Sequence, residues 1–137
     1  MSGPHSDDVY AEWPWLSIRW DRARKCVYAE FTGFANSEEF RTGTMRILDA
    51  IRDKHSRPLV SDNRRLEVVT DQDQLWIRDT WVPLAVAAGL QRIAVILARQ
   101  GLGRIASEEI LGRSVDREFV TRTFDLVPEA LKWVAGD

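Results

Sequence analysis

The chain has 137 residues, of which 45% are hydrophobic and 29% are charged, and these values are typical of one globular domain. Lys and Arg number 19 against 21 Asp and Glu, so the net charge of −2 argues against a general nucleic-acid binder, which is expected to be strongly basic. Cys26 is the only cysteine, and His5 and His55 are the only histidines, so the composition excludes an intrachain disulfide and a metal site built from several Cys or His ligands.

The N-terminal residues 1–12 are polar and acidic, and we expect them to form a mobile tail before a single domain over residues 13–137. No apolar stretch has the length of a signal peptide or of a membrane span, and the longest covers residues 82–90. A lone cysteine without an export signal indicates a reducing, cytoplasmic location.

The first half of the domain predicts a hairpin, a helix and a strand. Residues 15–20 and 26–31 are rich in β-forming residues and are joined by a polar turn, which is typical of an antiparallel hairpin. A helix is predicted to begin after Asn36, which can form a capping box with Glu39, and to end before Pro58. Residues 58–62 are short and apolar, and they predict a buried strand.

The second half alternates predicted helices and strands. Thr70 and Asp73 form a second capping box at the start of a helix over residues 70–89, which Pro83 is expected to kink and Gly89 to end. Consecutive apolar residues at 93–98 predict a central strand within 91–98. The remaining predictions are a helix over 102–111, an edge strand over 118–124 and a helix over 127–134.

The predicted order is β-β-α-β-α-β-α-β-α, an α/β fold with a mostly parallel five-stranded sheet, because successive βα units require parallel strands. This order, over about residues 13–136, resembles the SpoIIAA-like (STAS-type) group of the STAS/SEC14 superfamily. More specific support comes from Pro83 and from residues 60–64 (VSDNR), 73–76 (DQLW) and 88–95 (AGLQRIAV), which resemble bacterial STAS/SEC14 domain proteins.

The resemblance implies a small non-enzymatic domain. Anti-sigma-factor antagonists of this group are switched by phosphorylation of a Ser or Thr that follows an Asp after the third strand. Asp62 matches that Asp, but Asn63 and Arg64 stand at the acceptor position, so the resemblance implies that the switch is absent here. The SEC14 branch binds lipids in an apolar cavity, which suggests a second function.

Polar residues follow the predicted strands 58–62 and 91–98 at their carboxyl ends, where open α/β sheets bind ligands. We therefore expect a partner or ligand site that contains Asp62, Asn63, Arg64, Arg65 and Arg99. The alternative is that Asp62 and Asn63 cap the backbone of their own loop and that Arg64 pairs with Asp62.

Six Trp are many for a chain of this length, and Trp13, Trp15 and Trp76 are difficult to bury in a small domain. Exposed Trp often marks an interface, so we include Trp76 in the site and expect a homodimer. No catalytic constellation is indicated, because His55 and Asp62 are predicted at opposite ends of one strand.

We therefore expect a non-enzymatic binding or regulatory module, without cofactor or metal, that acts by protein–protein interaction with an unidentified partner. The alternative is a small carrier of an apolar or lipid-like ligand. A carrier predicts an apolar cavity with few convergent polar groups, whereas an interaction module predicts a filled core and an exposed apolar patch.

Overall fold

The computed structural model describes residues 7–67, 69–98, 102–113 and 120–136. Within these ranges, it confirms each helix and strand predicted from the sequence and adds one strand at the N-terminus. The elements in chain order are β1 (Asp7–Trp13), β2 (Leu16–Asp21), β3 (Cys26–Phe31), α1 (Ser37–Lys54), β4 (Pro58–Asp62), α2 (Asp71–Trp76), the π-helix η1 (Ile77–Trp81), α3 (Val82–Ala87), β5 (Arg92–Ile96), α4 (Leu102–Arg113), β6 (Val120–Phe124) and α5 (Val127–Val134).

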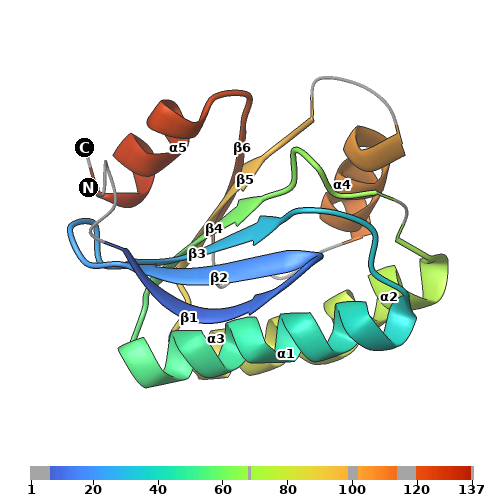
Figure 1. Ribbon diagram of the computed structural model, residues 1–137, viewed down its shortest axis with the longest axis horizontal. Helices are drawn as coiled ribbons and strands as arrows, with labels where there is room; N and C mark the ends of the chain where they lie inside the picture. Colours follow the sequence, from blue (N-terminus) through green and yellow to red (C-terminus); the bar gives the residue numbers. More distant parts are fainter. Residues whose placement is uncertain (1–6, 68, 99–101, 114–119, 137) are drawn as a thin grey trace.

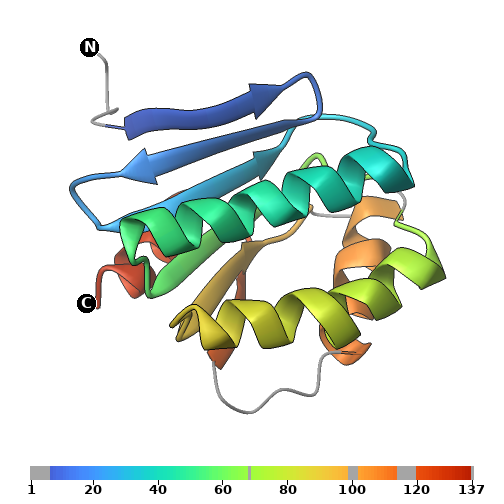
Figure 2. The same cartoon turned by 90° about the horizontal axis from the view of Figure 1, so that it is seen from below.

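One six-stranded sheet in the order β1-β2-β3-β4-β5-β6 forms the centre of the fold (Figure 1). The strands β1, β2 and β3 are antiparallel neighbours, whereas β3, β4, β5 and β6 are parallel. The helix α1 and the segment α2–η1–α3 lie side by side on one face of the sheet, and α5 covers the other face (Figures 1 and 2). Right-handed crossovers between successive parallel neighbours place their helices on the same face.

Successive side chains of the central strands point to opposite faces of the sheet, and this divides the apolar core into two clusters. Residues such as Val27 and Ile93 point toward α1 and the α2–η1–α3 segment, whereas Val60 and Ala94 point toward α5. Cys26 belongs to the second cluster and is fully buried, as its position within a strand predicted.

The predicted five-stranded sheet is wrong, and so is the predicted mobile tail for residues 7–12, because β1 extends the sheet by an edge strand that begins at Asp7. Residues 1–6 of that predicted tail lie outside the described residues. The hydroxyl of Tyr10 donates to the carboxylate of Asp53 on α1, and the guanidinium of Arg46 lies 4.8 Å from the centroid of the Tyr10 ring. These contacts stabilise a segment whose charged residues lower its local β-propensity but suit the edge of a sheet.

The helix predicted over residues 70–89 is divided by a π-helix. Pro83 has no N–H, and in an α-helix its ring would clash with the carbonyl of Asp79. The wider π turn before it has the N–H of Val82 donating to the carbonyl of Ile77. Gly89, with φ of 102°, provides the left-handed stop that the sequence predicted.

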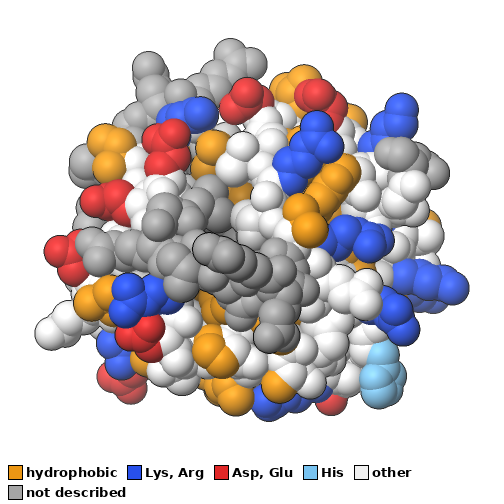
Figure 3. Space-filling view, turned by 180° about the vertical axis from the view of Figure 1, so that it is seen from behind, with side chains coloured by type: hydrophobic (Ala, Val, Ile, Leu, Met, Phe, Trp, Pro, Cys, Tyr) orange, Lys and Arg blue, Asp and Glu red, His pale blue; other side chains and the backbone are white. Residues whose placement is uncertain are grey.

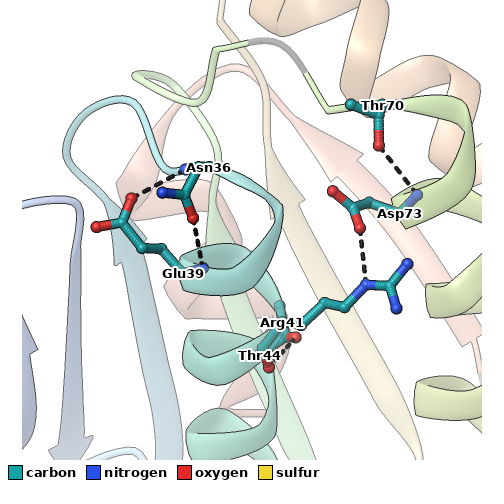
Figure 4. A network of polar contacts seen from close by, with 6 residues as sticks. All are labelled: Asn36, Glu39, Arg41, Thr44, Thr70 and Asp73. Atoms are coloured by element: carbon teal, nitrogen blue, oxygen red, sulfur yellow. Dashed lines mark hydrogen bonds and ion pairs between the residues drawn. The ribbon is translucent and has the colours of Figure 1, made fainter.

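The two predicted capping boxes differ in the hydrogen bond that the acidic side chain of each box makes (Figure 4). Asn36 and Glu39 each accept a hydrogen bond from the other's backbone N–H, which confirms the first capping box. Thr70 Oγ1 accepts from the backbone N–H of Asp73, but the Asp73 carboxylate accepts from Arg41 Nε of α1 at 2.8 Å. Asp73 therefore links α2 to α1.

We expect this link to make stability depend on pH. Burial alone would raise the pKa of Asp73, but hydrogen bonds from Ser37, Arg41 and Thr70 lower it below its ordinary value. The stabilisation by the ionised carboxylate is therefore fully present above about pH 4, the pKa of Asp in an unfolded chain, and is lost as the pH falls through the lowered folded value. Asp73→Asn should cost about 1–2 kcal/mol of unfolding free energy at pH 7.

Urea unfolding at pH 7 and at pH 3 measures this dependence. The difference between the wild type and Asp73→Asn should shrink at pH 3, where both side chains are neutral in the unfolded chain. Glu12→Gln, which removes an exposed carboxylate on β1, serves as the control and should behave as the wild type does. A difference of the same size at both pH values would contradict a role for the charge of Asp73.

Candidate functional site

The loop that the sequence singled out begins at the carboxyl end of β4, as predicted. Asp62 is the last residue of this strand and Asn63 follows it, so the two side chains point to opposite sides of the sheet. The residues predicted to act together are therefore divided between two environments.

Asp62 lies on the side of α5 and is only 1% exposed. Its carboxylate accepts hydrogen bonds from the hydroxyl of Tyr28 at 2.7 Å, and from Nε and Nη2 of Arg64 at 2.9 and 2.7 Å. Burial and the bond to Asp62 raise the pKa of Tyr28, and the same carboxylate raises the pKa of Arg64. Arg64 pairs with Asp62, as the alternative interpretation of this loop predicted, and each of the three groups has a partner.

Asn63 lies on the side of α1 and α4 and is 7% exposed. Its side-chain amide donates to Ser107 Oγ of α4 at 3.1 Å, and its side-chain oxygen accepts from Ser61 Oγ of β4 at 2.7 Å. The backbone N–H of Asn63 donates to the carbonyl of Ile96 on the neighbouring strand β5. Thus the Asn63 side chain joins β4 to α4 and does not cap its own loop.

Beside this polar cluster, a partly open cavity of about 110 Å³ lies between the helical layer and the sheet. Its lining is mostly apolar and comes from both layers: Phe31, Phe40, Ile47, Leu59, Leu66, Ile77, Trp81, Val82, Ile93, Val95 and Ile110. The polar lining residues are Thr44, Ser61, Asn63, Ser107 and Thr121. None of these residues has an ionisable side chain at neutral pH.

The π-helix shapes one wall of the cavity, to which Ile77 and Trp81 contribute. Trp81 is 5% exposed, and its indole N–H donates to the carbonyl of Thr44 on α1 at 2.7 Å. This bond fixes the ring between α1 and the sheet. At another wall, Thr121 is exposed on the edge strand β6, so the cavity extends to the surface beside this strand.

Arg65 and Trp76, two other predicted site residues, do not line this cavity. Arg65 is exposed, and Arg99 lies outside the described residues. Trp76 is half-buried on α2, where the guanidinium of Arg41 lies 5.2 Å from the centroid of its ring. The structure therefore assigns Trp76 to the contact between α1 and α2.

No Trp is exposed in the part of the chain that the structure describes, and Trp13 stacks on Trp15 with their centroids 5.7 Å apart. The large apolar side chains that are exposed lie apart from one another in the sequence: Val9, Phe34, Ile105, Val120 and Leu126. On the described part of the face in Figure 3, hydrophobic side chains likewise form small groups separated by charged ones. Exposed Trp therefore provides no support for an interface in the described part of the chain, and the homodimer stays a prediction.

Sequence reasoning missed Ser61, Trp81 and Ser107 as members of a site. Ser61 interrupts an apolar strand and Ser107 lies on a helix near apolar residues, but a single Ser in such places carries no signal by itself. Among the described residues, no three His, Cys, Asp or Glu side chains gather as metal ligands, and no described helix is long and apolar enough to span a membrane. Comparisons of the chain with protein-family models, with curated proteins and with solved structures gave no match.

Proposed function

We propose that this domain binds a small, largely apolar molecule between its helical layer and its sheet, and that it acts by binding rather than by catalysis. This is the second of the two functions expected from the sequence. The observation that carries it is the apolar cavity of about 110 Å³. For comparison, an engineered apolar cavity of about 150 Å³ in another protein binds benzene or xenon.

The chemistry of the lining supports binding rather than catalysis. A catalytic cleft is expected to contain ionisable groups with displaced pKa values. Here the pKa values of Tyr28 and Arg64 are raised, but both groups are paired with Asp62 on the other side of the sheet. The proposal of a SpoIIAA-like domain is supported by the order of elements from β2 to α5. The proposal of a cytoplasmic location is supported by the presence of a single cysteine, Cys26, in the sequence.

Titration with benzene, followed by NMR of the Ile, Leu and Val methyl groups, tests the proposal. Benzene should shift the methyl signals of Ile47 and Val95, which line the cavity, and leave unchanged those of Val60 on β4 and Val134 on α5, which pack on the other face of the sheet. At ten times its dissociation constant, benzene should stabilise the fold by about 1.4 kcal/mol.

A cavity-filling variant provides the matched test. Val82→Phe adds an aromatic ring at the cavity wall and should abolish the benzene-induced shifts without loss of stability, because the new atoms occupy existing space. Val9→Phe is the same substitution at an exposed position of β1 and should leave benzene binding unchanged. Benzene shifts that are absent from the wild type, or equal in Val82→Phe, would overturn the proposal.

A further inference from the structure

The hydrogen bonds that link Ser61, Asn63 and Ser107 in the cavity wall all run in one direction from donor to acceptor. Ser61 donates to the side-chain oxygen of Asn63, and the side-chain amide of Asn63 donates to Ser107 Oγ. The oxygen of Ser107 is thus an acceptor in this chain of hydrogen bonds, and its own O–H is left to donate. No described group accepts from it, although Ser107 is 1% exposed and lines the cavity.

Asn63 has a second donor of the same kind. Its amide group carries two N–H donors, and one of them is used by Ser107. The other has no acceptor among the described residues, and Asn63 is 7% exposed. Two buried donors therefore border a mostly apolar space, where a donor without a partner is unfavourable.

The lack of charge in the described lining restricts which kind of ligand can accept hydrogen bonds from these two donors. The described lining holds no Lys, Arg or His that could balance a carboxylate or phosphate, and no Asp or Glu that could balance a cation. An ion in this cavity would have no counter-charge from the described lining, and a charge removed from water without a partner is strongly unfavourable. The occupant that these groups favour is neutral.

We infer that the ligand is a neutral molecule with an apolar body and one hydrogen-bond acceptor, such as a carbonyl oxygen, which Ser107 and Asn63 bind. This inference rests on the proposed function, because it assigns a chemical class to the occupant of the same cavity. Ser107 and Asn63 provide the specificity, and the apolar lining provides the affinity.

Two probes of the same shape test the inference. Cyclopentanone carries a carbonyl oxygen where methylenecyclopentane carries a CH₂ group, so the pair differs in the acceptor alone. Ser107→Ala should weaken cyclopentanone binding about three- to tenfold and leave the binding of methylenecyclopentane within about twofold. Ser107→Thr keeps the hydroxyl and should retain the selectivity.

The control is Ser17→Ala, which removes another buried Ser hydroxyl outside the cavity lining and should change neither affinity. Ser107→Ala could instead weaken the binding of both probes equally, or of neither. In that case the Ser107 hydroxyl does not donate to the acceptor of the probe and is bonded to a water molecule. That result would overturn the inference and leave the proposed function standing.

If neither probe nor benzene shifts the cavity methyl signals of the wild type, the proposed function fails and the inference with it. A charged probe, cyclobutanecarboxylate, should not bind, and its binding as tightly as cyclopentanone would overturn the neutral ligand class.

Discussion

Replacing Arg64 by alanine should lower the free energy of unfolding by about 2–3 kcal/mol, although Arg64 lies in a surface loop and 46% of its side chain is exposed. The loss comes from Asp62, which is 1% exposed and whose carboxylate is bound by two nitrogens of the Arg64 guanidinium. Without the guanidinium, this buried charge keeps two donors among the described residues: the hydroxyl of Tyr28 at 2.7 Å and the backbone N–H of residue 64 itself at 3.3 Å.

A double-mutant cycle with Asp62→Asn measures the pair by urea unfolding. In the Asp62→Asn background no charge is left to balance, so Arg64→Ala should cost less than about 1 kcal/mol there. The neighbouring Arg65 is exposed, and Arg65→Ala should leave stability unchanged. An equal cost of Arg64→Ala in both backgrounds would show that the guanidinium stabilises the loop through contacts other than Asp62.

The order of elements from β2 to α5 could be predicted because its signals are local. Caps at Asn36 and Thr70, the left-handed stop at Gly89 and the apolar run before Ala98 each depend on a few neighbouring residues. The strand β1 could not be predicted in this way, because Tyr10 is held by residues of α1 that lie far away in the sequence.

The sequence predicted polar groups at the carboxyl end of β4 but not their division between the two faces of the sheet. The carboxyl end of β4 does carry buried polar groups, and the pairing of Arg64 with Asp62 was one of the two interpretations considered. The alternation rule could have separated Asp62 from Asn63, since consecutive residues at a strand end point to opposite faces.

The cavity itself depends on packing that no local pattern encodes. The sequence predicted that Pro83 interrupts its helix, but the direction in which the π turn points Trp81 follows from the bond to Thr44 on α1. Likewise, the partner of Asn63 is on α4, and the two residues are 44 positions apart. Contacts at this range require the assembled fold.

Trp81 carries the largest effect that we expect from a single substitution. Trp81→Ala should cost about 3–5 kcal/mol of unfolding free energy, because it removes a nearly buried indole and the hydrogen bond that its N–H donates to the carbonyl of Thr44. The space of the missing ring joins the existing cavity of about 110 Å³. Added indole should therefore bind there and, at a hundred times its dissociation constant, restore about 2.7 kcal/mol.

Thermal unfolding with and without indole measures this rescue, and Trp81→Leu replaces Trp81→Ala if the latter does not fold. The matched control is Trp133→Ala, which removes a half-buried Trp beside Phe124 on the α5 side of the sheet, and Trp133 does not line the cavity of about 110 Å³. Indole should raise the melting temperature of Trp81→Ala and leave that of Trp133→Ala unchanged. An equal response of the two variants would mean that indole binds wherever a Trp is removed, and that the space beside Trp81 is not a preformed site.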